Sequence, residues 1–391
     1  MDASLDLMVA AGGSTATDEE LQDLQGGHHD PRKRGFTLQQ AELRLSAAVD
    51  PYFDAVATFV TALEPLTNET SYEVEEAWLR TRELPEGLTL FVGQLLTRFG
   101  RKNQTHPHTW DWLDQPVINT RLFGGDGMRG LGASLAWTVP ASWTSDLHAS
   151  VQDANGETMV SFLSNEEAGE ERPIGGRPWT DRQVHSLGDL VWGLRWTNQV
   201  EVDDENDLHF GLSGLYGPNA SGPSGWTAIY GLDLEWQWAP PDAIRKTPSW
   251  RVRTEIMGRT YAAARYEDLG DPGDPGDDVL IGADTLHDRG GYLEVLHGFA
   301  VGWDAGLRLE YATGSGGDVD PATGSPVDRQ DDPYRDDRYR VSPLLAYRPT
   351  EFSHIRLQYA YDHADHLTGG EAHSVWLGFE VLIGSHPAHG W

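Results

Sequence analysis

Cysteine is absent from the 391 residues of this sequence, so no disulfide bond can hold the fold together. Basic residues are scarce: 29 Lys and Arg stand against 61 Asp and Glu, which gives a formal net charge of -32. Phosphate binding needs a basic surface, so nucleic acid is not expected as a partner. Long hydrophobic runs are missing as well, and none approaches the roughly 20 apolar residues that a membrane-spanning helix requires.

Two further absences bear on activity and location. The sequence holds no G-x-S-x-G, H-E-x-x-H, P-loop or dinucleotide-binding motif, and we therefore predict that the protein is not an enzyme. Residues 1–13 lack the basic region and the long apolar core of a secretory signal. We interpret the chain as a mature form from which such a signal is absent.

What the sequence has in abundance is two-residue alternation. In residues 230–238, Tyr, Leu, Leu, Trp and Trp alternate with Gly, Asp, Glu and Gln. This period is typical of a β-strand with one apolar and one polar face. It predicts about sixteen strands, many of them as long as the roughly ten residues that cross a bilayer. They span residues 5–11, 36–49, 53–63, 71–82, 88–99, 129–138, 145–153, 187–200, 207–217, 226–238, 249–265, 286–300, 303–313, 337–348, 353–362 and 373–384.

The connections between these strands alternate in length. The short ones are residues 50–52, 83–87, 139–145, 203–207, 301–303 and 348–352, and the long ones are 12–35, 100–128, 154–186, 266–285 and 314–336. This sorting is typical of a transmembrane barrel with short periplasmic turns and long extracellular loops. The sequence therefore predicts an all-β protein, one antiparallel up-and-down barrel over residues 1–391 with about 16 strands (range 12–18). A soluble protein with two packed sheets is the alternative.

In such a barrel the apolar faces point into lipid and the polar faces line the lumen. Both signs of charge occur on the polar faces, as a water-filled or cross-bridged interior would allow. The predicted pore-lining residues are Glu42, Arg44, Arg195, Asp233, Glu235, Arg251, Arg253, Glu255, Arg308, Glu310 and Arg356.

Five stretches of the chain resemble bacterial outer-membrane proteins of porin type. They are residues 35–59, 72–81, 88–140, 349–362 and 373–391. Members of this family are often labelled porin-like, or zinc-regulated TonB-dependent receptors; only a few dozen residues precede the second predicted strand here, so no plug domain is expected. The resemblance implies the bacterial outer membrane, contact with lipid and lipopolysaccharide, and a homo-oligomer. The terminal aromatic Trp391, after an alternating strand, resembles the signal read by the barrel-assembly machinery.

The segment 100–132 is long, polar and aromatic, and it follows the fifth predicted strand, which places it on the extracellular side. Its apolar residues suit a loop that folds into the barrel mouth and narrows it; a loop that caps the mouth is the alternative. The predicted constriction residues are His106, His108, Trp110, Asp111, Trp112 and Asp114.

The sequence indicates metal binding less strongly than it indicates the barrel. His106 and His108 offer imidazole nitrogens that suit Zn²⁺. Residues 28–30, His386 and His389 raise similar but weaker suggestions. The acidic segments 267–278 and 332–339 offer oxygen ligands for Ca²⁺, or are merely solvated loops. No other cofactor is predicted.

Taken together, these patterns predict a channel for passive diffusion of small hydrophilic solutes. The acidic loops favour cations, because carboxylates at a mouth concentrate them. Two alternatives stay open. One is a structural or partner-binding barrel whose lumen is plugged by cross-linked charges. The other is a barrel for zinc-linked uptake.

Overall fold

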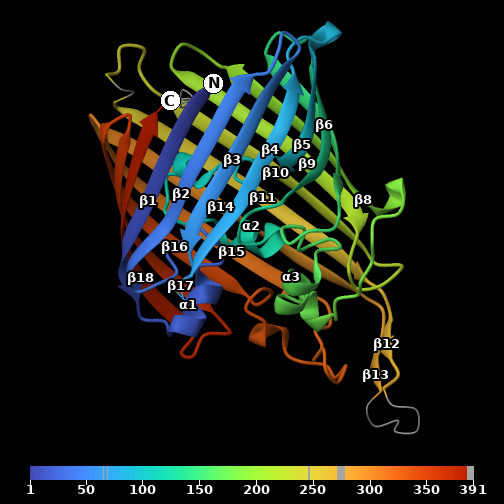
Figure 1. The fold of residues 1–391 in the computed structure, drawn as a ribbon. Coiled ribbons are helices and arrows are strands. Elements are labelled where there is room, and N and C mark those ends of the chain that lie inside the picture. Colours follow the sequence, from blue (N-terminus) through green and yellow to red (C-terminus); the bar gives the residue numbers. More distant parts are fainter. Residues whose placement is uncertain (65, 68, 245–246, 271–277, 385–391) are drawn as a thin grey trace.

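The structure is a computed structural model that describes residues 1–391 except residues 65, 68, 245–246, 271–277 and 385–391. Within the described residues, sixteen strands close into one barrel (Figure 1). These strands are β1 (Asp2–Ser14), β2 (Gly35–Ala48), β3 (Phe53–Leu63), β4 (Thr70–Thr81), β5 (Leu88–Leu96), β6 (Arg129–Thr138), β7 (Thr144–Asp153), β8 (Leu190–Glu201), β9 (Asn206–Pro218), β10 (Trp226–Trp238), β11 (Ser249–Ala263), β14 (Asp284–Ala300), β15 (Trp303–Ser315), β16 (Arg338–Thr350), β17 (Ser353–Ala364) and β18 (Glu371–Gly384).

Each strand of the barrel pairs antiparallel with its neighbours along the chain, and β1 pairs with β18 to complete the ring. A separate hairpin, β12 (Tyr266–Asp268) and β13 (Val279–Ile281), lies in the connection between β11 and β14. The prediction of an all-β up-and-down barrel with about 16 strands is confirmed. The calls on Trp391, His386 and His389, and on part of the acidic segment 267–278, lie outside the described residues.

The two faces of the wall are the reverse of those in a soluble protein. On β10, Leu232 and Leu234 are 46% and 36% exposed, whereas Asp233 and Glu235 between them are 3% and 1% exposed. The same inversion holds on β15, where Leu307 is exposed and its neighbour Arg308 is fully buried. Charged side chains therefore fill the inside of the barrel, and the apolar face of the alternating strands points outward.

The two ends of the barrel differ as the loop lengths predicted. In Figure 1 the short turns, the beginning of β1 and the end of β18 lie at one end. The opposite end carries the helices α1 (Asp18–Leu24) and α3 (Glu166–Glu171) together with the β12–β13 hairpin (Figure 1). The third α-helix, α2 (Val117–Phe123), lies within the ring of strands. None of the helices in the described parts of the chain is long and apolar enough to cross a bilayer.

Short 3-10 turns complete the secondary structure at Pro85–Gly87, Pro107–Thr109, Ile174–Gly176, Leu187–Asp189 and Arg329–Asp331.

An apolar core lies inside the barrel and is built mainly by its connections. Phe99, Phe123 and Phe162 come from the β5–β6 and β7–β8 connections, and they cluster with inward side chains of the wall such as Ile229 and Met257. Phe99 and Phe123 lie with ring centroids 5.1 Å apart. Burying these rings stabilises the folded connections, because apolar surface removed from water contributes about 25 cal/mol per Å². The half of the lumen nearer to the long connections is therefore partly filled by protein.

The two strands that close the ring, β1 and β18, come very close together at one pair of residues. Gly12 of β1 lies opposite Trp376 of β18, and Trp376 is fully buried. A Cβ on Gly12 would lie 2.5 Å from the Trp376 ring and 2.0 Å from the Val375 carbonyl oxygen. Only a glycine leaves room for the inward indole at this point of the seam.

Candidate functional site

The β5–β6 connection, residues 97–128, runs through the inside of the barrel, and we call it the inner segment (Figure 1). Its backbone hydrogen-bonds to inward side chains on different parts of the wall. The N–H of Lys102 donates to Glu255 Oε1 of β11 at 2.8 Å. Fifteen residues on, the N–H of Val117 donates to Glu310 Oε2 of β15 at 2.7 Å. The inner segment is therefore fixed to the wall along its length.

The segment lies where the sequence placed it but ends sooner. Residues 129–132, the end of the predicted segment 100–132, belong to β6, which agrees with the strand predicted over residues 129–138. Within β6, a Cβ on Gly132 would lie 2.1 Å from the Val151 carbonyl oxygen, so the close approach to β7 requires glycine there. All six predicted constriction residues lie on the inner segment, and all but the half-buried His108 are buried: His106, His108, Trp110, Asp111, Trp112 and Asp114.

Asp114 joins the inner segment to three strands. Its carboxylate binds Arg308 of β15, Arg340 Nη1 of β16 at 2.9 Å and Gln358 Nε2 of β17 at 2.9 Å. Burial alone would raise the pKa of Asp114, but the two guanidinium groups hold it below its usual value. The carboxylate stays ionised, and each of its charge-assisted hydrogen bonds tightens the contact between segment and wall.

Asp111 makes a second junction nearer to the short-turn end. Its Oδ1 lies 2.6 Å from Arg251 Nη2 and 3.1 Å from Arg348 Nη2. Between the two aspartates, the fully buried Trp112 donates from Nε1 to the Ser342 carbonyl at 2.9 Å. One side of the lumen, along β14 to β18, is thus closed by the inner segment and its arginine partners.

His106 and His108 hold the segment against β2 and β4. The two ring nitrogens of His106 lie 2.8 Å from Glu75 Oε2 and 2.9 Å from Glu76 Oε2. Glu42 Oε2 lies 3.3 Å from His106 Nδ1 and 3.4 Å from His108 Nδ1. Burial lowers the pKa of His106, but the carboxylates of Glu75 and Glu42 raise it more, so that it lies well above 6.5. His106 is therefore an imidazolium with a carboxylate on each side.

A β-bulge creates this carboxylate cluster. Between β3 and β4 the register shifts, so that Thr58 pairs with Glu76 while Phe59 pairs with Val74. Glu75 is the extra residue, and both Glu75 and Glu76 are buried inside the barrel. Strict alternation would have sent one of them outward, which is why sequence reasoning missed both. Bulges often re-aim side chains in this way near functional sites.

All the predicted pore-lining residues lie on the inner face. They are buried or partly buried, whereas the residues that alternate with them are exposed or partly exposed: Glu42, Arg44, Arg195, Asp233, Glu235, Arg251, Arg253, Glu255, Arg308, Glu310 and Arg356. Several are brought together as ion pairs on the inner face. Arg253 of β11 pairs with Glu235 of the neighbouring β10 at 2.5 Å, Arg195 of β8 reaches past β9 to Asp233 of β10 at 2.7 Å, and Arg308 pairs with Glu310 on the same strand at 2.7 Å. Further inward charges that the sequence reading left unnamed are Asp6, Glu294, Arg338, Arg340, Asp362 and Glu380. The alternation of their own strands would have found them.

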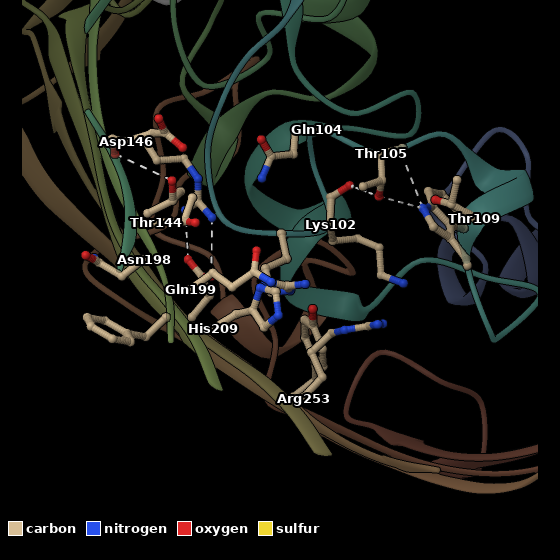
Figure 2. A pocket seen from close by; sticks show the side chains of 17 residues that line it. Lys102, Gln104, Thr105, Thr109, Thr144, Asp146, Asn198, Gln199, His209 and Arg253 are labelled. Atoms are coloured by element: carbon tan, nitrogen blue, oxygen red, sulfur yellow. Dashed lines mark hydrogen bonds and ion pairs between the residues drawn. The ribbon is translucent and has the colours of Figure 1, made fainter. Parts of the chain in front are cut away.

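The other side of the lumen is hollow. A cavity of about 390 Å³ lies between residues 101–110 of the inner segment and strands β7 to β11 (Figure 2). It reaches Thr144 and Gln199 beside the short turns, and its lining includes Arg101, Lys102 and Trp110. A smaller cavity of about 100 Å³ continues along β4 to β7, and Gln104 lines both.

Two groups of side chains among the described residues have the spacing of metal ligands. One joins Glu42, Glu75 and His106; the other joins His29, Glu73 and Asp126. His108 and the acidic segments that the sequence suggested do not enter either group within the part of the chain that is described. The expected metal binding of His106 and His108 stays a prediction.

No model of a known protein family matches this chain. An uncharacterized protein of Aquifex aeolicus (strain VF5) is 28% identical over 414 residues, which cover 99% of this chain and 79% of that protein. Among solved structures, OmpT of Vibrio cholerae in its trimer form has a TM-score of 0.52 and 8% identity, covering 98% of each chain. An anion-selective porin from Comamonas acidovorans has a TM-score of 0.53 and 8% identity over 97% of this chain and 99% of that one. OprB of Pseudomonas putida has a TM-score of 0.53 and 9% identity over 98% and 93%.

The fold is that of an outer-membrane porin. At these identities the likeness concerns the fold, and the inner segment is described from this chain alone. Inside this fold, Asp111, Asp114 and their arginines fill one side of the lumen, and a cavity lies on the other side beside β7 to β11.

Proposed function

We propose that this porin-type barrel lies in the bacterial outer membrane and admits small hydrophilic solutes by passive diffusion. The observation that carries the proposal is the asymmetry of the lumen. The inner segment is tied to β15 and β16 by buried ion pairs, while a cavity of about 390 Å³ follows β7–β11 from the segment toward the short turns. The route runs along this hollow side, between Arg101 and Lys102 of the segment and the wall.

The lining of this route favours polar solutes without a strong charge preference of its own. Its cations are paired: Arg101 Nη2 lies 3.0 Å from Glu235, and Arg195 Nη1 lies 2.7 Å from Asp233. Paired charges largely cancel at a distance, so we propose that selectivity comes from the acidic extracellular loops. The net charge of -32 makes that preference cationic and weak, and salt should screen it, since the Debye length is only about 8 Å at physiological ionic strength.

Planar-bilayer recording of the purified protein under a KCl gradient tests this function. We expect stable steps of conductance, a reversal potential of cationic sign, and a smaller preference as the salt concentration rises. An absence of conductance, or an anionic reversal potential, would contradict the proposal.

A second candidate is a closed structural or partner-binding barrel. The dense charge bridges of Asp111 and Asp114, together with the apolar core around Phe99 and Phe123, favour it. Liposome swelling separates the two candidates, because a closed barrel passes no sugar. Zinc-linked uptake and the lack of enzymatic activity stay predictions, as do contacts with lipopolysaccharide and the assembly machinery. We propose a homo-oligomer in the membrane, which light scattering of the detergent-solubilised protein tests.

A further inference from the structure

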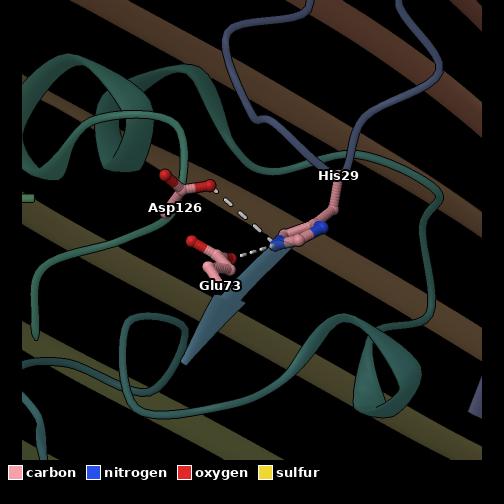
Figure 3. A group of neighbouring side chains, drawn as sticks. All are labelled: His29, Glu73 and Asp126. Carbon is pink, nitrogen blue, oxygen red and sulfur yellow. Dashed lines mark ion pairs between the residues drawn. The ribbon is translucent and has the colours of Figure 1, made fainter. Parts of the chain in front are cut away.

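His29, in the β1–β2 connection, has an unusual environment. Its side chain is buried, with 3% of the residue exposed, and its Nε2 has no hydrogen-bond partner among the described residues. This nitrogen lies 3.9 Å from Glu73 Oε1 and 3.9 Å from Asp126 Oδ1. Figure 3 shows the imidazole directed between the two carboxylates. A distance of 3.9 Å is too long for a hydrogen bond.

The other ring nitrogen determines which tautomer is present. Nδ1 of His29 lies 3.4 Å from the Gln39 carbonyl oxygen, which can only accept. The proton therefore lies on Nδ1, and the lone pair of Nε2 faces two carboxylate oxygens. Three electron-rich atoms that converge on one point repel each other, and a cation between them relieves that repulsion. A second proton on Nε2 would still have no acceptor within hydrogen-bond distance.

Both carboxylates are oriented by partners that leave one oxygen for this point. Arg129 binds Oε2 of Glu73, so that Oε1 faces His29. His28 Nδ1 lies 2.8 Å from Oδ2 of Asp126, so that Oδ1 faces His29. Hydrogen bonds of this kind to ligand side chains are typical of metal sites, where they fix the direction of each ligand.

The backbone around His29 is held in place as well. The N–H of His28 donates to the Gly125 carbonyl at 3.0 Å, and Gln39 Nε2 donates to the His29 carbonyl at 2.7 Å. Gly125 allows this approach, because a Cβ there would lie 2.5 Å from His28 Cδ2. The three side chains thus come from three segments, the β1–β2 connection, β4 and the end of the inner segment, that are already fixed next to each other.

We propose that His29 Nε2, Glu73 Oε1 and Asp126 Oδ1 bind a divalent transition-metal ion such as Zn²⁺. One imidazole nitrogen with two carboxylate oxygens suits Zn²⁺, whereas Ca²⁺ and Mg²⁺ prefer oxygen alone. Bonds of about 2.0–2.2 Å to each ligand bridge the gap after a small contraction of the site. Glu73, whose side chain is 24% exposed, leaves room for water as a further ligand. The site would join the β1–β2 connection to the inner segment, and it does not depend on the proposed channel activity.

The neighbouring group around His106 serves as an internal contrast. There both imidazole nitrogens already lie within 2.9 Å of a carboxylate oxygen of Glu75 or Glu76. A proton on each nitrogen satisfies that group, so a metal ion binds there only if it displaces one of these protons. We therefore expect Zn²⁺ to bind at His29 in preference to His106.

Isothermal titration of the purified full-length barrel in detergent with ZnCl₂ and with CaCl₂ tests the proposal. We expect one tight Zn²⁺ per barrel, little heat with Ca²⁺, and a loss of affinity of about tenfold or more in His29→Ala and in Asp126→Asn. His106→Gln is the matched control and should bind Zn²⁺ as the parent does. Heat-modifiable migration on a gel shows which variants are folded, and Glu73→Gln replaces any that is not. Unchanged affinity in folded His29→Ala, or an equal loss in His106→Gln, would overturn the proposal.

Cobalt offers a second readout that a merely structural role would not affect. Co²⁺ bound by one nitrogen and carboxylate oxygens gives visible absorption bands whose position and intensity report the coordination. We expect these bands in the parent and in His106→Gln, and their loss in His29→Ala. Bands that persist in folded His29→Ala would show that the ion binds elsewhere.

Discussion

The carboxylate of Glu255 accepts the backbone N–H of Lys102 at 2.8 Å. The same Oε1 accepts the N–H of Arg101 at 3.1 Å and the hydroxyl of Tyr292 at 2.6 Å. One wall residue of β11 therefore fixes the point where the inner segment turns beside the 390 Å³ cavity.

Glu255→Ala removes this anchor and leaves two backbone donors buried without an acceptor. Each unsatisfied donor costs about 1–3 kcal/mol, so the beginning of the inner segment should become mobile. We expect larger and noisier single-channel conductance and a lower unfolding temperature. Ile256→Val, on the outward side of the same strand, is the control and should change neither. If the Glu255→Ala variant shows the same conductance and the same low current noise as the parent, Glu255 does not hold the segment.

Conductance should also depend on pH through His106. Its pKa is raised above 6.5 by Glu75 and Glu42 despite burial. A histidine of this kind contributes stability that is fully present below the unfolded value and is lost as pH rises through the folded pKa. In alkaline solution the neutral imidazole no longer offsets the repulsion among Glu42, Glu75 and Glu76, although His108 stays beside Glu42 and Arg44 beside Glu76.

We therefore expect the inner segment to loosen as pH rises from below 6.5 into the alkaline range, seen as increased current noise. His106→Gln should remove most of this pH dependence, because glutamine has no proton to lose in that range. His185→Gln, in a different connection, serves as the control. An identical pH profile in parent and His106→Gln would contradict the assignment.

Asp114→Asn tests the closed side of the lumen. The substitution leaves the buried Arg308 and Arg340 without the carboxylate that they share. Removing one partner of a buried pair costs about 3–5 kcal/mol, and we expect a corresponding loss of stability in urea unfolding from detergent or vesicles. Asp54→Asn breaks a more exposed pair with Arg80 at 3.1 Å and should cost at most about 1 kcal/mol. Equal effects of the two changes would contradict the role of Asp114.

Leu234→Arg tests the outward direction of the apolar face. Leu234 is 36% exposed on the wall, and an arginine near the bilayer midplane costs about 2–4 kcal/mol. We expect less folded protein in lipid vesicles, measured by heat-modifiable migration, whereas Leu234→Ile should be tolerated. A spin label at Leu234 should be relaxed by oxygen dissolved in the lipid. A label protected from both oxygen and polar quenchers would mean that this face is buried in protein.

The alternation of the strands was enough to predict the wall. Leu232 and Asp233 fall on opposite faces because the side-chain period of a strand is two, and this holds whatever surrounds the barrel. The lengths of the connections predicted which end of the barrel carries the short turns and which carries the long loops. Both signals are properties of short stretches of chain, and the structure agrees with them.

The contacts inside the barrel could not be predicted from strand alternation or from the lengths of the connections. Asp114 meets Arg308 and Arg340 only because the inner segment crosses the lumen, and no local pattern specifies that path. The bulge at Glu75 breaks the alternation on which the prediction relied. His29, Glu73 and Asp126 come from three separate connections or strands, so their convergence depends on the tertiary fold.

The glycine at the seam has a consequence for how the ring is completed. A slip of two residues between β1 and β18 would keep every side chain on its proper face, yet it would bring Ala10 or Ser14 opposite Trp376 instead of Gly12. The Cβ of either residue would meet the indole where Gly12 leaves space. A slip of one residue would turn the charged face of β1 toward lipid. The contact between Gly12 and Trp376 therefore favours the observed alignment of the first and last strands over a slip of two residues in either direction when the ring closes.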